Sequence, residues 1–117
     1  MIKNKECTKF YSTNHESSIA RAIGGETIKG SGNGHFTKGD VVHEGANMVI
    51  EAKCTMTPKK SISIKKEWID KNKKESLAMR KSNQAICINF EPNGENYYLI
   101  NESLFKFLID KLTEENS

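Results

Sequence analysis

The chain has 117 residues, a hydrophobic content of 36%, a charged content of 28% and a formal net charge of +3. A chain of this length is expected to form one domain with a single modest core. No apolar run approaches the ~20 residues of a membrane span. Because the first residues also lack the apolar stretch of a signal peptide, we expect a cytoplasmic protein with no membrane partner. Three cysteines without a CxxC motif favour reduced thiols over disulfides or a zinc site.

Positive charge is concentrated in the middle of the sequence. Residues 53–81 contain ten basic and three acidic side chains, whereas residues 91–117 contain two basic and six acidic ones. A basic block of this kind favours binding of a polyanion such as DNA. A solvated, lysine-rich helix face would give the same composition, so the block alone leaves both interpretations open.

The first third of the chain predicts one short helix. Residues 1–12 show no clear period and are expected to form a loose arm. Thr13 and Glu16 have the spacing of a capping box, which predicts a helix that begins there and ends at Gly24. Residues 30–39 contain four glycines and predict a flexible loop.

Two short strands are predicted next, over residues 40–43 and 48–54, joined by a turn at residues 44–47. Side chains alternate between the two faces of a strand. Glu51 and Lys53 are therefore expected to share one face, while the other face of the second strand is apolar and belongs to the core.

The second half predicts a long amphipathic helix over residues 63–82 and two strands, 84–90 and 96–100, joined by a turn that contains an Asn-Gly pair. A final helix capped by Asn101 follows, and residues 113–117 are expected to be a frayed tail. This helix is expected to turn four apolar side chains inward: Leu104, Phe105, Leu108 and Leu112.

The predicted order is α-β-β-α-β-β-α with possible extra short strands. Such an order predicts one α/β domain over residues 13–112, with a central mixed β-sheet flanked by helices.

An acid-and-lysine pattern on the two central strands predicts a metal site. Asp40 opens the first strand, and Glu51-Ala52-Lys53 lies in the second. Mg²⁺ prefers oxygen ligands, which Asp40, Glu51 and the Ala52 carbonyl would supply. The metal acidifies a bound water, and Lys53 would orient or deprotonate that water, as phosphodiester hydrolysis requires. An exposed strand with a surface Glu–Lys pair is the alternative interpretation.

Four further polar residues are candidates for the same site. Glu16 can supply a third acid from the first helix, although the capping box alone also accounts for it. Ser31, Lys38 and Lys65 are candidates for contacting phosphates, and each can equally be a solvated surface residue. The glycines of residues 30–34 lack the spacing of a nucleotide-binding loop, and neither His-Glu pair has the second histidine of a zinc protease.

Residues 13–110 resemble the PD-(D/E)XK nuclease superfamily and, within it, the small Holliday-junction-resolvase-like nucleases of archaea and phages. Five segments carry the resemblance: Glu16 with Arg21, Gly30-Ser31-Gly32, Lys38-Gly39-Asp40-Val41-Val42, Ile50-Glu51-Ala52-Lys53, and the helix from Ser63 to Glu75. The resemblance implies a restriction-endonuclease-like fold, dependence on Mg²⁺ with Mn²⁺ as a substitute, and a homodimer in which each subunit cuts one strand of branched DNA.

The resemblance also assigns roles to residues. It implies that Glu16, Asp40 and Glu51 hold the metal, that Lys53 serves the attacking water, and that Ser31 assists. One departure is Gly39, which stands where the family usually has a proline before the metal-binding aspartate. The superfamily uses one core for restriction, repair, recombination and replication, so its motif specifies the reaction better than the substrate.

The sequence as a whole therefore predicts a Mg²⁺-dependent, structure-selective DNA endonuclease, a Holliday junction resolvase of phage or prophage type that acts in DNA recombination. Contacts from the basic segment to the phosphate backbone predict binding that weakens steeply with salt. Two alternatives remain: a nicking or restriction-type nuclease on linear duplex DNA, and a non-catalytic DNA-binding module.

Overall fold

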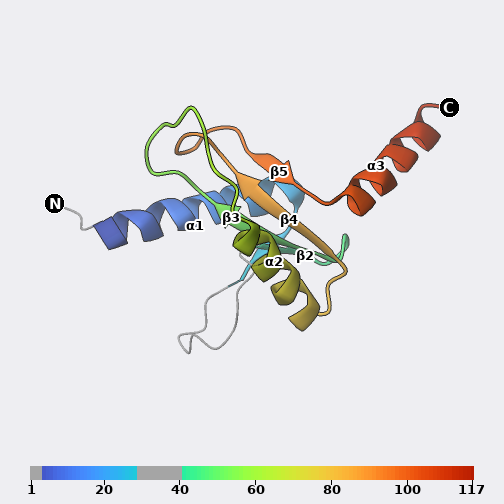
Figure 1. Ribbon diagram of the computed structural model, residues 1–117, viewed down its shortest axis with the longest axis horizontal. Helices are drawn as coiled ribbons and strands as arrows, with labels where there is room; N and C mark the ends of the chain where they lie inside the picture. The colour runs from blue at the N-terminus through green and yellow to red at the C-terminus, as the bar shows by residue number, and fades with distance from the viewer. Residues whose placement is uncertain (1–3, 29–40) are drawn as a thin grey trace.

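The computed structural model describes residues 4–28 and 41–117, with side chains from Asn14 onward (Figure 1). Its elements in chain order are α1 (Asn4–Ile23), β1 (Glu26–Thr27), β2 (Val41–His43), β3 (Met48–Lys53), α2 (Lys66–Ala78), β4 (Asn83–Ile88), β5 (Tyr97–Leu99) and α3 (Glu102–Glu115). The predicted α/β class, with a central mixed sheet flanked by helices, is confirmed. Among the described helices, none is long and apolar enough to cross a membrane.

The sheet has five strands in the described residues, in the order β1-β2-β3-β4-β5. Neighbouring strands are antiparallel except β3 and β4, which are parallel and are connected by α2. The predicted hairpin between β2 and β3 is confirmed, with Val41 paired to Ile50. Its turn is closed by the Asn47 amide, which donates to the Glu44 carbonyl at 3.0 Å while Asn47 takes a positive φ of 52°.

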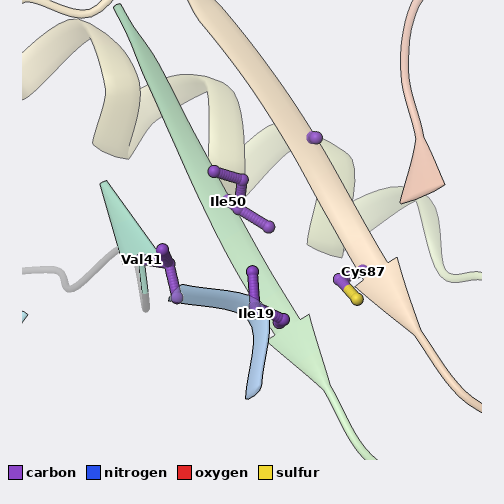
Figure 2. Packing of buried hydrophobic residues seen from close by; sticks show 5 residues of the cluster. Ile19, Val41, Ile50 and Cys87 are labelled. Carbon is purple, nitrogen blue, oxygen red and sulfur yellow. The ribbon is translucent and has the colours of Figure 1, made fainter. Parts of the chain in front are cut away.

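The apolar core lies between the sheet and α1. Figure 2 shows Ile19 of α1 against side chains from β2, β3 and β4. The buried members of this cluster are Ile19, Val41, Ile50, Ala85 and Cys87. Close approach of the chain after α1 depends on Gly25, because a Cβ there would lie 2.8 Å from the Val42 carbonyl oxygen. Gly24 ends the helix with φ +75°, as predicted.

Helix α2 packs on the opposite face of the sheet through polar side chains. Its buried residues are Asn72, Glu75 and Ser76, not an apolar stripe, and the helix is shorter than the predicted 63–82. The Asn72 side chain donates to the Val49 carbonyl at 3.5 Å, and the Gln84 side chain donates to Ser76 Oγ at 2.8 Å. These hydrogen bonds compensate part of the cost of burying polar groups against β3 and β4.

Two further helix boundaries differ from the prediction. Helix α1 begins at Asn4, so residues 4–12 are helical and the predicted start at Thr13 is wrong. No glycine or proline lies between residues 4 and 23, so nothing in the backbone interrupts the helix there. Helix α3 continues to Glu115, beyond the point at which fraying was expected.

The expectation that α3 packs inward is also wrong. All residues of α3 are described, and none of their side chains is buried. Phe105 is 56% exposed, Leu108 43% and Leu112 59%, because the helix points away from the sheet (Figure 1). The predicted cap is confirmed, since the Leu104 amide donates to Asn101 Oδ1 at 2.8 Å.

A buried histidine of α1 contacts β4 and the segment before β5. His15 is 5% exposed, and its Nε2 lies 2.9 Å from Asn96 Oδ1 and 3.5 Å from Cys87 Sγ. Burial lowers the pKa of His15, and its hydrogen bond with Asn96 opposes this effect. Burial raises the pKa of Cys87 to about 12, so its thiol is a poor nucleophile. Within the described side chains, Cys54 and Cys87 are free thiols, as predicted.

We expect the stability of the protein to fall when the pH is lowered through the ordinary histidine pKa of about 6.5. Below that pH the unfolded chain binds a proton that folded His15 resists, so the free energy of unfolding decreases. Urea unfolding at pH 7.5 and pH 5.5 measures the difference. His15→Gln should reduce the pH dependence, whereas His43→Gln should retain it. Parallel pH profiles for wild type and His15→Gln would contradict this account.

Candidate active site

Strand β3 places Glu51 and Lys53 on the face that α2 covers, so the predicted sharing of one face is confirmed. Lys53 Nζ lies 3.5 Å from Glu51 Oε2. The side chain of Glu51 is only 3% exposed, whereas that of Lys53 is 32% exposed. The alternative of a surface Glu–Lys pair is therefore wrong for Glu51. Lys53 Nζ also lies 4.8 Å from the centre of the Trp68 ring, a cation–π distance that restrains the ammonium at the edge of α2.

Helix α2 adds a second lysine and a second carboxylate. Lys71 Nζ lies 3.8 Å from Glu51 Oε1 and 3.7 Å from Glu75 Oε1. Glu75 is fully buried, and the side chain of Lys71 is 55% exposed. Glu51, Lys53, Lys71 and Glu75 thus form one ion-paired group between β3 and α2, called here the carboxylate–lysine cluster.

Burial of two carboxylates in this cluster is unfavourable for stability alone. Removing each ion from water costs several kcal/mol, and well-packed apolar side chains of similar volume are often at least as stable. The ion pairs are 3.5 to 3.8 Å long, which exceeds the roughly 2.7–2.9 Å of a strong charge-assisted hydrogen bond. Buried charges held in this way are typical of functional sites, where an arrangement is kept for its chemistry.

The oxygen atoms of Glu51 suit a hard cation. Glu51 Oε2 is buried and accepts no hydrogen bond within the described residues, so it can accept one more ligand. Mg²⁺ needs only one or two carboxylates, because it keeps several of its waters. In residues 4–28 and 41–117 no three His, Cys, Asp or Glu side chains are grouped for a metal. The Ala52 carbonyl, predicted as a further ligand, lies on β3 beside Glu51, and its role stays a prediction.

The other predicted site residues are placed as follows. Glu16 lies on α1, on the opposite face of the sheet from α2, and within the described residues it is outside the carboxylate–lysine cluster. Lys65 is the N-cap residue of α2, and its side chain is 62% exposed. Asp40, Ser31 and Lys38 lie outside the described residues.

Sequence reasoning missed Lys71 and Glu75. The buried stripe of α2 follows the helical period from Trp68 through residues 72, 75 and 76 to Met79. Both ends of this stripe are apolar, and its middle is polar. A polar interruption between two large apolar residues on one helical face was the available signal, because such a face must pack against something that compensates its charges.

Comparison of the chain with protein-family models, with curated proteins and with solved structures finds no match. The carboxylate–lysine cluster is therefore the main evidence for function. Its distinguishing feature is a buried carboxylate with an ammonium on each side, one from the same strand and one from the covering helix.

Replacing Lys71 with methionine should destabilise the fold by about 2 kcal/mol, because it removes the positive charge shared by two buried carboxylates. Adding Glu75→Leu to this variant should recover most of the loss. Urea unfolding of the two single variants and the double variant measures this coupling.

The exposed pair Lys66–Asp70, also spaced i to i+4, is the matched control. Lys66→Met should change stability by less than about 0.5 kcal/mol. Equal effects of Lys66→Met and Lys71→Met would show that the cluster has no special energetic role.

Proposed function

We propose that this protein is a Mg²⁺-dependent DNA endonuclease that hydrolyses phosphodiester bonds, with a Holliday junction as its substrate. The observation that carries the proposal is the buried Glu51 carboxylate with Lys53 Nζ 3.5 Å from it. A carboxylate supplies a ligand for a hard cation, and the lysine is close enough to act on a water held beside that carboxylate. Mn²⁺ should substitute for Mg²⁺.

Two of the proposed metal ligands neighbour a pair of residues of the β2–β3 hairpin in the sequence. In the β2–β3 hairpin Val41 pairs with Ile50, and their sequence neighbours are Asp40 and Glu51. The proposal requires the carboxylates of Asp40 and Glu51 to reach one ion, with the Ala52 carbonyl as a third protein ligand. Glu16, which the resemblance implies as a third acid, is not used in this proposal, because it lies on α1, on the opposite face of the sheet from Glu51 and α2.

The bound cation would supply an acidified water and neutralise charge on the phosphate. Lys53 is proposed to orient or deprotonate that water and to stabilise the additional negative charge of the transition state. Its contact with the Trp68 ring limits where the ammonium can move. Lys71 holds Glu51 from the other side and keeps its carboxylate in one position.

The surface beside the cluster is suited to phosphates. Exposed lysines on and next to α2 include Lys65, Lys66 and Lys74. They belong to the basic segment of residues 53–81 and can grip the DNA backbone without reading its sequence. Ser31 and Lys38 are proposed as further contacts to phosphates near the scissile bond.

The junction is proposed as the substrate because of the resemblance of the motif, and the size of the chain bears on how a junction would be held. A domain of 117 residues offers little surface for a four-way junction. A symmetric homodimer would present two sites and make two paired cuts, as resolution of a junction requires. We place this activity in the cytoplasm, in DNA recombination.

Mg²⁺ should raise the free energy of unfolding, because it neutralises a carboxylate that the fold buries. At a concentration ten times its dissociation constant, the expected gain is about 1.4 kcal/mol. Thermal unfolding with and without Mg²⁺ measures it. Glu51→Gln should abolish the gain, whereas Glu67→Gln should keep it, since Glu67 is 74% exposed on the outer side of α2. A gain that survives in Glu51→Gln would remove Glu51 from the metal site.

Cleavage is tested on a labelled four-way junction beside linear duplex DNA with the same arms, in Mg²⁺ or in EDTA. We expect paired symmetric nicks in the junction, lost in EDTA. Glu51→Gln and Lys53→Met should each lower the rate by at least about a hundredfold, in the range of a lost catalytic group. Glu67→Gln should cleave like wild type.

Each other result assigns a different function. Equal cutting of duplex and junction would keep the nuclease and discard the junction as its substrate. If the protein binds DNA but does not cleave it in Mg²⁺ or in Mn²⁺, the protein is a DNA-binding module and not an enzyme. Cleavage that Glu51→Gln does not affect would place the active site elsewhere.

A further inference from the structure

Helix α3 carries exposed apolar side chains along its length. Five large ones on this helix are between 43% and 59% exposed: Phe105, Phe107, Leu108, Ile109 and Leu112. Figure 1 shows α3 leaving the sheet after β5 and pointing away from the other elements. The radius of gyration is 15.0 Å, above the ~13 Å expected for a compact chain of this length. An apolar helix in this position needs a partner.

The helix cannot rely on its own backbone for stability. An isolated helix of its 14 residues is only marginally stable in water, and most helices in proteins are stabilised by packing of one face. Its polar surface is already satisfied by ion pairs of Lys106 with Asp110 at 3.1 Å and of Lys111 with Glu114 at 3.5 Å. The apolar side chains at 104, 105, 108, 109 and 112 follow the helical period and form one stripe.

A groove of matching chemistry lies between α2 and the β4–β5 edge of the sheet. Its lining includes the apolar side chains of Ile69, Ile86, Leu99 and Ile100, with Lys73 among the polar lining residues. Its volume is about 140 Å³, close to the roughly 150 Å³ of an apolar cavity that holds a benzene ring. The groove can therefore take one aromatic side chain such as Phe105.

We propose that α3 of one copy of this chain packs its apolar stripe over this groove on a second copy, and that the second copy does the same in return. Each chain has both the apolar stripe of α3 and the groove, but its own stripe does not contact its own groove. Reciprocal exchange across a two-fold axis covers both stripes and both grooves at once, and it closes the assembly. Leu99, which lines the groove, is only three residues before α3 begins, so each helix leaves its own chain at the groove that receives the partner's helix.

The charges of α3 and α2 also favour α3 of a second copy as the occupant of the groove. Helix α3 has four acidic and two basic side chains, whereas residues 65–81 have seven basic and three acidic ones. An acidic helix over the basic rim of α2 gains attraction, which steers the two copies into register. The inference deepens the proposed nuclease by naming how its two subunits join, but its evidence is apolar exposure and charge. It stands whether or not the chain cuts DNA.

The mass of the full-length protein in solution is the first test, measured by light scattering and sedimentation over a series of concentrations. We expect twice the 13.2 kDa of one chain. Leu108→Lys on α3 and Leu99→Lys in the groove should each shift the protein to the monomer and lower its helix content by circular dichroism. Leu77→Lys should remain dimeric, because Leu77 is a 74% exposed leucine of α2 outside the groove lining.

The exchange itself is tested in a mixture of isotope-labelled and unlabelled chains. Filtered nuclear Overhauser contacts should join the Phe105 ring of one copy to methyl groups of Ile69 or Leu99 of the other. Contacts of this kind within one copy would show that α3 folds back on its own groove, and contacts only between two α3 helices would show a dimer of a different design. Either result would overturn the proposal.

A wild-type monomer at every concentration would overturn it as well, as would a dimer that Leu108→Lys leaves intact. Junction cleavage by the same samples separates this inference from the proposed function. An exchanged dimer that cuts no DNA would reject the nuclease and keep the interface. A monomer that cuts the junction would keep the nuclease and reject the interface.

Discussion

Burial of the Glu51 carboxylate beneath α2 is the constraint on which the arrangement of this protein depends. A charged group inside a small domain must be compensated, and here Lys53 and Lys71 do so from the strand and the helix. A second carboxylate, Glu75, is buried on the same side by α2 and shares Lys71 with Glu51. The two faces of the sheet thus differ: α1 covers an apolar cluster that includes Ile50 and Cys87. On the face that α2 covers, Glu51 lies among the buried apolar side chains of Val42, Val49 and Ile86.

The parts of the fold that the sequence could predict are those governed by local rules. Alternation on β3, the turn at Asn47 and the cap at Asn101 each depend on residues close in the chain, and each was predictable. The start of α1 was not predictable, because a capping-box spacing inside a longer helix looks the same in sequence as one at the beginning of a helix. The exposure of the apolar stripe of α3 was not predictable either, since amphipathic spacing predicts a face that becomes buried but does not say which molecule covers it.

The residues of the candidate site also differ in how far they could be predicted from local rules. Glu51 and Lys53 were predictable because strand alternation puts them side by side, and Glu51 proved more deeply buried than spacing alone indicates. Lys71 and Glu75 were not predicted, because their importance comes from a contact between α2 and β3 and not from a motif. Polar residues on an otherwise apolar helical stripe conflict with the local rule for a packed helix, and such conflicts tend to occur at functional positions.

The parallel pairing of β3 with β4 through α2 has a consequence for how the molecule is assembled. Every member of the carboxylate–lysine cluster lies within residues 51–75, so the cluster needs only one short loop of chain to close. The apolar core, by contrast, joins Ile19 to Ala85 and Cys87 across most of the chain. Closing a short loop of chain costs less entropy than closing a long one. The most charged interior group of the domain therefore depends on one local segment, whereas its hydrophobic core depends on segments far apart in the sequence.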